Sequence, residues 1–283
     1  MQEFNFHSHT YRCGHADFDY TDEEYVLDYI KQGFKRIAFT DHAPEKHIVD
    51  KRAHMRMGYE QRHEYYSSIK TLQEKYKDKI EIQTGFEIEF LPDQIDDIME
   101  LKSETDKLIL GQHFVYDENQ KDLVIFGKGF TWKIQDMIRY GEYLKQAMEL
   151  GIPDIVAHPD IAFRNTKVYG EEEEKIIRTI CETAERTGIP LEINLNGIAA
   201  ATYFKDKKLN EDSFEMQVER LDKSVYPTRE FWKIASEYDI KVVYGLDTHH
   251  RNYIEKAEKL MKLANIKIGE DVIEKLNFVQ DMK

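Results

Sequence analysis

The chain begins with two histidines whose spacing suits metal binding. His7 and His9 follow an alternating run, 1–6, that is typical of a β-strand. In an extended backbone, side chains two residues apart point to the same side, so both imidazoles can face one point. Imidazole nitrogen is a common ligand of divalent metal ions. Taken alone, the pair fits equally well two solvent-facing polar residues on a strand.

Further ligand-type residues follow later apolar segments in the same way. Seven of the eleven histidines lie at or just after the end of a predicted strand, and two carboxylates accompany them. Any one of these histidines fits a hydrogen-bonded structural role, but nine ligand-type side chains at equivalent positions exceed the needs of one ion. A carboxylate can bridge two ions, which suits Glu87 or Asp247. The nine predicted metal ligands are His7, His9, His15, His42, Glu87, His113, His158, Asp247 and His249.

The elements that must position these residues alternate along the chain. After the strand at the start, short apolar strands are predicted at 36–40, 80–86, 108–111, 154–157, 190–195 and 240–246. Helices are predicted at 21–33, 59–76, 92–103, 132–150, 171–187, 228–238, 253–264 and 271–280. The stretch 200–223 has no clear period. Alternation of strands and helices predicts a parallel sheet.

The number of strands and the positions of the ligands favour a closed or nearly closed α/β barrel over an open sheet. In a barrel, the carboxyl ends of all strands meet on one face, where loops build the site. No glycine-rich turn of the kind that cradles nucleotide phosphates is present. No internal linker is rich enough in Pro, Gly or Ser to mark a boundary, so we expect residues 1–283 to form one domain.

Charge and cysteine content narrow the class of protein. The 283 residues include 54 acidic and 40 basic ones, a net charge of −14, which argues against a general nucleic-acid binder. Two cysteines imply no disulfide framework and fit a reducing cytoplasm. The start lacks the pattern of a secretory signal, and no apolar run approaches the about 18 residues of a membrane span. We therefore expect a soluble, cytoplasmic protein without nucleic-acid or membrane partners. The sequence does not indicate the oligomeric state.

The ordered set of motifs resembles the PHP (polymerase and histidinol phosphatase) superfamily. The motifs are H-S-H at 7–9, C-G-H at 13–15, T-D-H at 40–42, G-F-E at 85–87, G-Q-H at 111–113, A-H-P-D at 157–160 and G-L-D-T-H at 245–249. They occur in the family's order, and the last replaces the commoner G-S-D-A-H with its ligand types intact. The resemblance implies a distorted (β/α)7 TIM-like barrel, a single PHP-type metal-dependent hydrolase domain. That fold agrees with the seven strands counted above.

The resemblance also implies three divalent ions, for which zinc, iron and manganese are all suitable. His7, His9, Glu87 and Asp247 would hold the first ion. Glu87 would bridge to the second, which His113 and His158 also bind, and His15, His42 and His249 would hold the third. Glu89 replaces Glu87 as the ligand only if the strand register is shifted.

Within the family, the chain is most similar to monofunctional histidinol-phosphate phosphatases. This likeness implies hydrolysis of L-histidinol phosphate to L-histidinol and phosphate, a late step of histidine biosynthesis. A phosphate monoester is a dianion near neutral pH, so metal ions are needed to neutralise it and to generate hydroxide for in-line attack. The expected nucleophile is a metal-bound hydroxide, without a Ser or Cys nucleophile.

Residues that bind the substrate are harder to predict. Arg164 matches the family's phosphate-binding arginine and could hold two oxygens, although an ordinary surface arginine fits the sequence too. Asp17, Asp160, Glu89 and the loop 44–57 are candidates to recognise the ammonium and imidazole groups, or to support metal ligands. His47 and His54 in that loop fit either a lid or general-acid role or a solvated loop. No general acid is assigned.

Three other functions remain open at this point. The same barrel could act on another phosphate monoester, such as a nucleotide or a sugar phosphate. Amidohydrolase-type metal barrels also open with H-x-H, but they usually hold one or two metals, often with a modified lysine at a strand end, and no lysine is so placed. A metal-binding module that only assists a polymerase is the non-catalytic alternative.

Overall fold

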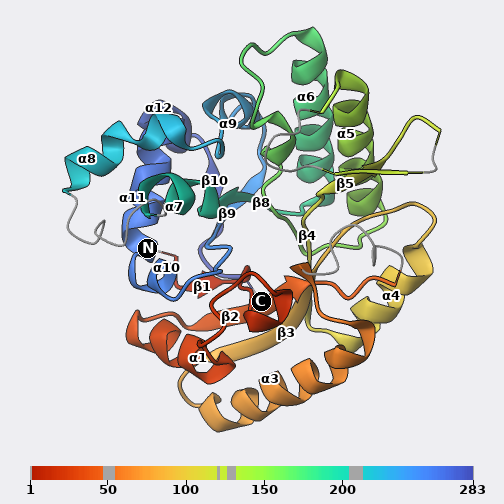
Figure 1. Cartoon of the computed structure of the whole chain (residues 1–283). Coiled ribbons are helices and arrows are strands. Elements are labelled where there is room, and N and C mark those ends of the chain that lie inside the picture. Colours follow the sequence, from red (N-terminus) through yellow and green to blue (C-terminus); the bar gives the residue numbers. More distant parts are fainter. Residues whose placement is uncertain (1, 47–54, 120–121, 126–131, 204–212, 283) are drawn as a thin grey trace.

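The computed structural model describes residues 2–46, 55–119, 122–125, 132–203 and 213–282. Within these ranges, ten strands form a large parallel sheet and a separate antiparallel pair (Figure 1). The large sheet has the order β1 (Phe4–Asn5), β2 (Arg36–His42), β3 (Glu81–Ile88), β4 (Lys107–Leu110), β7 (Ile155–Val156), β8 (Leu191–Asn194), β9 (Lys241–Gly245) and β10 (Asn277–Phe278). The pair consists of β5 (Phe114–Tyr116) and β6 (Leu123–Ile125).

Helices surround the strands on the outside (Figure 1). The α-helices are α1 (Asp22–Lys31), α3 (Arg62–Tyr76), α4 (Ile95–Glu104), α5 (Ile134–Glu149), α6 (Glu171–Thr187), α7 (Asn196–Tyr203), α8 (Phe214–Glu219), α9 (Arg229–Ala235), α10 (Asn252–Glu255), α11 (Ala257–Ile268) and α12 (Glu270–Ile273). Short 3-10 helices are η1 (Tyr11–Cys13), η3 (Tyr59–Gln61), η4 (Ile161–Phe163) and η6 (Leu221–Lys223).

Both faces of the parallel sheet are apolar and buried. In β2, Ile37 and Phe39 belong to the large core between sheet and helices, whereas Ala38 belongs to a second, smaller core. Because side chains alternate along a strand, the two cores lie on opposite faces of the sheet. The smaller core fills the inside of the curled sheet, and its members are Phe4, Phe6, Ala38, Ile109, Ile155, Ala157 and Val243.

The residues just after β1 pair with the residues just after β9. Ser8 and Thr248 form a parallel bridge, and the His9 N–H donates to the Thr248 carbonyl oxygen at 3.0 Å. The Tyr29 hydroxyl of α1 joins the two sides, at 2.6 Å from Ser8 Oγ and 3.0 Å from Thr248 Oγ1. The sheet is therefore a distorted barrel, and the predicted α/β barrel class is confirmed. The seven predicted strands are β1, β2, β3, β4, β7, β8 and β9.

The C-terminal segment differs from its prediction. The helix predicted over 271–280 is wrong beyond Ile273, where α12 ends, and the chain then adds β10 beside the start of β9. Past β10, Val279 and Met282 pack against the smaller core. Arg36 of β2 donates to Asp281 Oδ1 at 2.7 Å, which fastens this segment across the end of the barrel. Two strand residues are too few to give a detectable alternation in sequence.

Three other boundaries also differ. The helix predicted to begin at Pro92 begins at Ile95, because a turn closed by Gln94 N–H to the Leu91 carbonyl precedes it. The helix predicted over 253–264 is divided into α10 and α11. The stretch without clear period, 200–223, contains the second half of α7 together with α8 and η6. The hairpin of β5 and β6 was not predicted.

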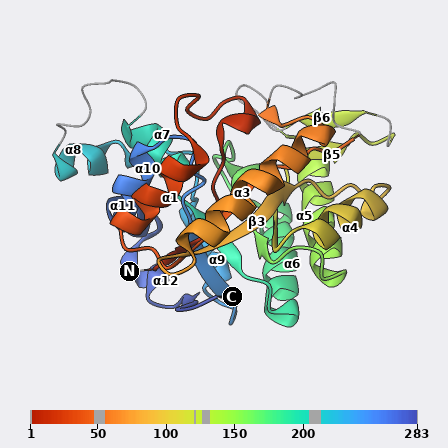
Figure 2. The ribbon, with the colours of Figure 1, turned by 90° about the horizontal axis from the view of Figure 1, so that it is seen from below.

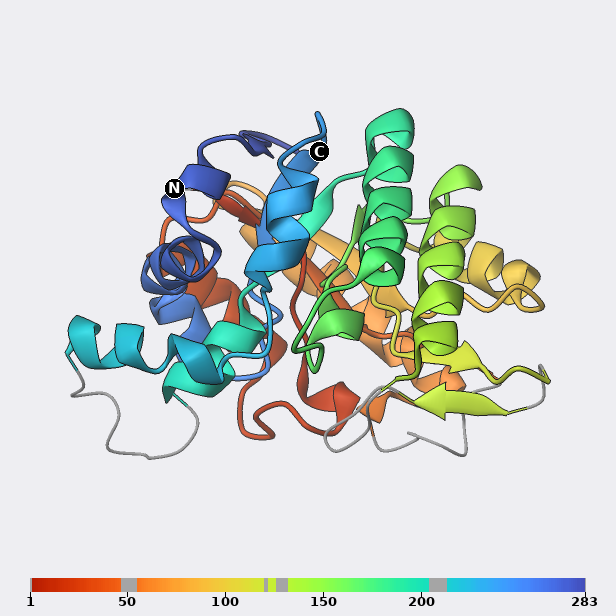
Figure 3. The ribbon, with the colours of Figure 1, turned by 90° about the horizontal axis from the view of Figure 1, so that it is seen from above.

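The two ends of the barrel carry different features. Seen from below and from above, η1, α7 and the β5–β6 hairpin lie on one side, and the two chain ends lie on the other (Figures 2 and 3). None of the helices in the described part of the chain is both long and apolar enough to span a bilayer.

Candidate metal centre

Strand register brings ligand-type residues from neighbouring strands side by side. His42 ends β2 and is paired in register with Glu87 of β3. Ala38 points into the barrel, so the alternation of β2 turns His42, four residues later, to the same inner face. Parallel strands all place their carboxyl ends at one edge, which collects the residues that follow them.

Two motif glycines leave room for buried carboxylates. A Cβ atom on Gly111, in the G-Q-H motif, would lie 1.7 Å from Glu87 Oε1. A Cβ on Gly245, in the G-L-D-T-H motif, would lie 1.6 Å from Glu192 Oε1. Any side chain at either position would displace the carboxylate beside it. The glycines of these motifs are therefore required by close approach.

Glu87 lies between two sets of histidines. Its Oε2 atom faces one set and its Oε1 atom faces the other, so the carboxylate is placed to contact two ions at once. From Oε2, the distances are 3.6 Å to His7 Nε2, 3.4 Å to His9 Nε2 and 2.9 Å to His42 Nδ1. From Oε1, they are 2.9 Å to His158 Nε2 and 3.9 Å to His113 Nε2.

Asp247 completes the first of these sets. Its Oδ1 atom lies 3.5 Å from His7 Nε2 and 3.2 Å from His9 Nε2, and the two imidazole nitrogens are 3.2 Å apart. The other oxygen, Oδ2, accepts hydrogen bonds from the side-chain amides of Asn194 and Asn196 at 3.2 and 3.1 Å. One oxygen of Asp247 is thus held by amides while the other faces imidazoles.

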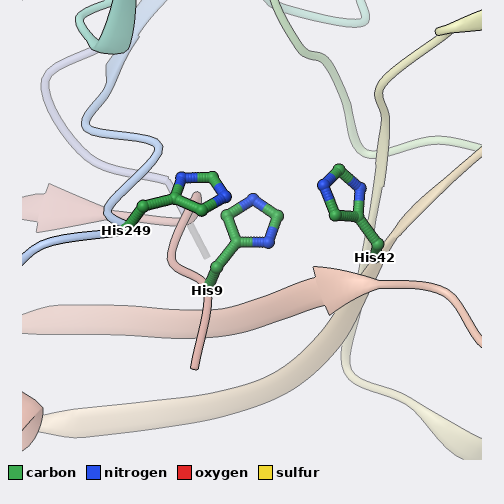
Figure 4. A group of neighbouring side chains, drawn as sticks. All are labelled: His9, His42 and His249. Carbon is green, nitrogen blue, oxygen red and sulfur yellow. The ribbon is translucent and has the colours of Figure 1, made fainter. Parts of the chain in front are cut away.

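A third set of rings lies next to the first. The His15 ring centroid is 4.4 Å from that of His249 and 5.5 Å from that of His42. Figure 4 shows the ring of His9 between those of His249 and His42, with all three turned toward the same space. The Cys13 thiol is also within 4.8 Å of ligand nitrogens of His15 and His249. Sequence analysis did not select Cys13 as a ligand.

The structure thus brings all nine predicted ligands into one continuous cluster, mostly buried. His15 and His113 are half-buried, and the other seven are buried. Several buried atoms in the cluster have no hydrogen-bond partner among the described residues: Glu87 Oε2, Asp247 Oδ1, His9 Nδ1, His158 Nδ1 and His249 Nε2. Buried polar atoms are normally paired, and cations would satisfy the oxygens and nitrogens that face the centre of the cluster. The donor set therefore fits divalent metal ions.

Electrostatics keep the two carboxylates in the form that binds cations. Burial works to raise the pKa of Glu87, but the surrounding imidazoles, led by His42 and His7, together outweigh it and hold the pKa well below its usual value. For Asp247, His7 and His249 likewise outweigh burial and lower the pKa. Burial, followed by repulsion from His249, lowers the pKa of His9 to about 3, which keeps its imidazole neutral.

Two further acidic residues, Glu89 and Glu192, form hydrogen bonds with predicted metal ligands. Glu89 accepts from the His113 backbone N–H at 2.6 Å, and its Oε1 lies 2.9 Å from His113 Nδ1. Glu192, which sequence analysis missed, contacts His7 and the backbone of His158. The signal that could have found Glu192 is an acid inside the predicted strand 190–195, two residues before Asn194, so that both polar side chains point to the same face.

The predicted substrate-binding residues lie near the cluster but have different surroundings. Asp160 is fully buried and accepts from the Thr228 backbone N–H at 2.6 Å. Asp17 faces the turn after the last ligand, where its oxygens lie 2.8 Å from His250 Nδ1 and 3.0 Å from the Arg251 backbone nitrogen. Both carboxylates thus already bind the protein itself, and their contact with substrate stays a prediction.

Arg164 follows η4 and is half-buried. Burial raises the pKa of Tyr226, and the positive charge of Arg164 opposes that rise. The Tyr226 ring lies 6.4 Å from that of His158. Arg164 follows His158 by six residues, directly after η4.

A small pocket adjoins the cluster. It is lined by His42, Met55, Arg56, Glu89, His113 and Phe114. The buried Arg56 guanidinium is paired with Glu45 and lies 3.9 Å from Glu89. Residues 47–54 of the loop 44–57, including His47 and His54, lie outside the described residues, so their predicted lid and general-acid roles are not addressed.

An α/β barrel with this cluster at the carboxyl ends of its strands defines a protein that uses divalent metal ions. Residues 5–196 match the model of the PHP domain family, and the chain belongs to that family. The family predicted from the motifs is thus confirmed.

Relatives and solved structures agree with this assignment. The chain is 27% identical over 239 residues to the histidinol-phosphatase of Bacillus subtilis, a match that covers 75% of this chain and 88% of that one. A candidate histidinol phosphatase, HisK, of Listeria monocytogenes has a similar fold, with a TM-score of 0.67 and 21% identity over 90% of this chain and 98% of that one. Histidinol phosphate phosphatase of Lactococcus lactis, solved with zinc, L-histidinol and phosphate, gives a TM-score of 0.60 and 19% identity over 93% and 94%.

Proposed function

We propose that the protein is a metal-dependent phosphatase that hydrolyses L-histidinol phosphate to L-histidinol and phosphate. Membership of the PHP domain family supports this, as does the likeness to the Bacillus subtilis histidinol-phosphatase along most of both chains. A fold neighbour binds zinc, L-histidinol and phosphate. The observation that carries the proposal is the position of Glu87, whose two oxygens face separate sets of histidines.

The proposed centre holds three divalent ions, zinc, iron or manganese. The first would bind His7, His9, Glu87 and Asp247, and Glu87 would bridge to the second at His113 and His158. His15, His42 and His249 would hold the third. Because ligand atoms of His9, His42 and His249 also lie within 4.8 Å of one another, the third ion would lie next to the first.

The chemistry proposed for the residues follows from their charge and reach. When bound, divalent ions neutralise the phosphate and lower the pKa of water. Glu87 and Asp247, kept ionised by their neighbours, compensate the positive charge of the centre. Arg164 is proposed to bind two phosphate oxygens, since its guanidinium offers parallel donors.

Asp160 and Asp17 are proposed to act on the amine end of the substrate. The buried surroundings of Asp160 raise the pKa of its carboxyl to about 6, although the Thr228 N–H favours the charged form. Because Asp160 is fully buried, it would contact an ammonium only if residues around it move. The alternative is that both aspartates position the turns that carry His158 and His249.

Release of inorganic phosphate tests the proposal. Protein stripped with a chelator and reloaded with zinc, iron or manganese is compared on L-histidinol phosphate, a nucleoside monophosphate and a sugar phosphate. We expect fastest turnover of histidinol phosphate, about three metals per chain by elemental analysis, and no turnover after stripping. His158→Ala should reduce turnover by about 100-fold or more, because even substitutions beside metal ligands cost 10- to 100-fold.

His63→Ala provides the matched control, because this histidine is exposed on α3 and should leave turnover unchanged. Faster hydrolysis of another phosphate monoester would contradict the proposed substrate but support phosphatase activity. One or two metals together with amide hydrolysis would support an amidohydrolase instead. Metal binding without hydrolysis of any substrate would support the non-catalytic module.

A further inference from the structure

Glu192 is a buried acid of β8 that contacts more than one predicted ligand. Its Oε1 atom lies 2.8 Å from His7 Nδ1, and its Oε2 atom accepts from the His158 backbone N–H at 3.0 Å. The side chain is 2% exposed. Because a carboxylate accepts hydrogen bonds and does not donate, His7 Nδ1 must carry the proton of the first contact. That proton leaves His7 Nε2 as the atom that faces Glu87, His9 and Asp247.

A neighbouring amide extends the network to Asp247. Asn194 Nδ2 lies 2.8 Å from Glu192 Oε2 and 3.2 Å from Asp247 Oδ2, so one amide group donates to both carboxylates. Asn194 is in register with Gly245, two residues before Asp247. The network therefore joins ligands from three separate parts of the chain.

The network also contacts two ligands whose backbone conformations are strained. His158 has a φ of 31° and Asp247 a φ of 47°, values that residues other than glycine rarely adopt. Such conformations persist only where surrounding contacts hold them. Glu192 holds the His158 backbone directly, and Asn194 holds the Asp247 side chain. The absence of a side chain at Gly245 makes the space that Glu192 occupies.

We propose that Glu192 is a positioning residue for the metal centre: with Asn194, it fixes the tautomer of His7 and locks His158 and Asp247 in place. Glu192 is not a metal ligand in this scheme and does not touch the substrate. The inference rests on the metal centre of the proposed function. It states that the Glu192 carboxylate, together with Asn194, keeps the ligands of that centre in fixed positions.

Glu192→Gln tests the proposal with little change in shape. Three donors converge on the two carboxylate oxygens, but a glutamine side chain has one oxygen and one NH₂ group, so at least one donor loses its acceptor. We expect the Kd for Co²⁺, used as the probe, to rise 10- to 100-fold. The visible absorption spectrum of bound Co²⁺, which reports ligand geometry, should also change. Gly245→Ala, which keeps the carboxylate but displaces it, should produce both effects.

Asp136→Asn is the matched control for loss of a buried carboxylate. Asp136 lies on the outer helix α5, is 6% exposed and caps the helix by accepting from the Lys133 backbone N–H at 2.9 Å. This variant should lower the melting temperature and leave the Kd and spectrum unchanged. If Glu192→Gln behaves in the same way, the positioning role is wrong.

The measurement separates this inference from the proposed function. Co²⁺ binding needs no substrate, so a wild-type protein that binds Co²⁺ but does not hydrolyse histidinol phosphate contradicts only the proposed activity. Wild-type binding with an unaltered Kd and spectrum in Glu192→Gln contradicts only the role of Glu192. Wild-type protein that binds no Co²⁺ contradicts both.

Discussion

At the scale of single residues, the metal centre depends on which groups each of the two carboxylate oxygens of Glu87 and Asp247 contacts. Glu87 turns both oxygens toward imidazoles, whereas Asp247 gives one to imidazoles and the other to amides. The two acids are therefore not equivalent. Loss of charge at Glu87 affects both sets of histidines, and loss at Asp247 affects one directly.

Glu87→Gln should remove metal from the protein without unfolding it. The amide keeps the size of the side chain but loses the negative charge that offsets the bound cations. We expect metal affinity to fall by at least about 100-fold, beyond the cost of altering a residue that only supports a ligand. Elemental analysis and a chelator competition measure this. Glu81→Gln, at the exposed start of the same strand, is the control, and equal metal content in the two variants would contradict the assignment.

At the scale of elements, strands deliver the site and capped helices fix the strands. Helix α1 begins with a capping box, in which Thr21 and Glu24 exchange hydrogen bonds: the Thr21 backbone N–H donates to Glu24 Oε2 at 2.8 Å. Tyr29 on the same helix then reaches the two chain segments that carry His7, His9 and Asp247. The N-cap at Thr21 fixes where α1 begins, and the start of the helix in turn fixes the position of Tyr29 along it.

The capping box predicts a pH dependence of stability. Hydrogen bonds from the Thr21 backbone and hydroxyl lower the pKa of Glu24 below 4.5 in the folded state. A lowered folded pKa stabilises the fold above the unfolded pKa, and this contribution is lost as the pH falls through the folded value. Wild type should therefore be more stable than Glu24→Gln at neutral pH, with the difference disappearing in acid. Urea unfolding at several pH values measures it.

Glu3→Gln serves as the control for that comparison, because it removes one exposed carboxylate outside any helix. A constant difference between wild type and Glu24→Gln from neutral to acid pH would show that the charge of Glu24 has no part in the cap.

At the scale of the whole molecule, the barrel has a chemical end and a structural end. The predicted ligands lie at the carboxyl ends of the strands, and the C-terminal segment covers the opposite end, where Val279 and Met282 contact the inner core. Loops at the first end can vary the chemistry, whereas apolar contacts at the other end determine stability.

Ending the chain at Leu276 should destabilise the protein but spare its chemistry. Three partly buried apolar side chains (Phe278, Val279 and Met282) and the β10 pairing are lost, which costs about 2 kcal/mol or more of unfolding free energy. Denaturant unfolding measures the loss, and phosphate release measured under folding conditions should be unchanged. Gln280→Ala in the full chain is the control, since this side chain is exposed. A large loss of turnover in folded, shortened protein would contradict the separation of the two ends.

Much of this arrangement could be predicted from sequence, for identifiable reasons. Six of the seven barrel strands lead into a predicted metal ligand, so periodicity and chemistry indicated the same places. The segment after Ile273 could not be predicted, because its two-residue strand exists only through pairing with β9. Glu192 was missed because it lies inside a strand, whereas sequence analysis looked for ligand-type residues at or after strand ends. Its partners are 185 and 34 residues distant in the chain.

The bridge between Ser8 and Thr248 has a consequence for biosynthesis of the protein. Residues near position 8 and residues near position 248 build the same centre, because His9 N–H bonds to the carbonyl of Thr248. Contacts so remote in the chain form only after the intervening residues are made. A chain made only as far as residue 246 lacks Asp247 and His249, so the proposed first and third ions lack part of their ligand sets until residue 249 is made.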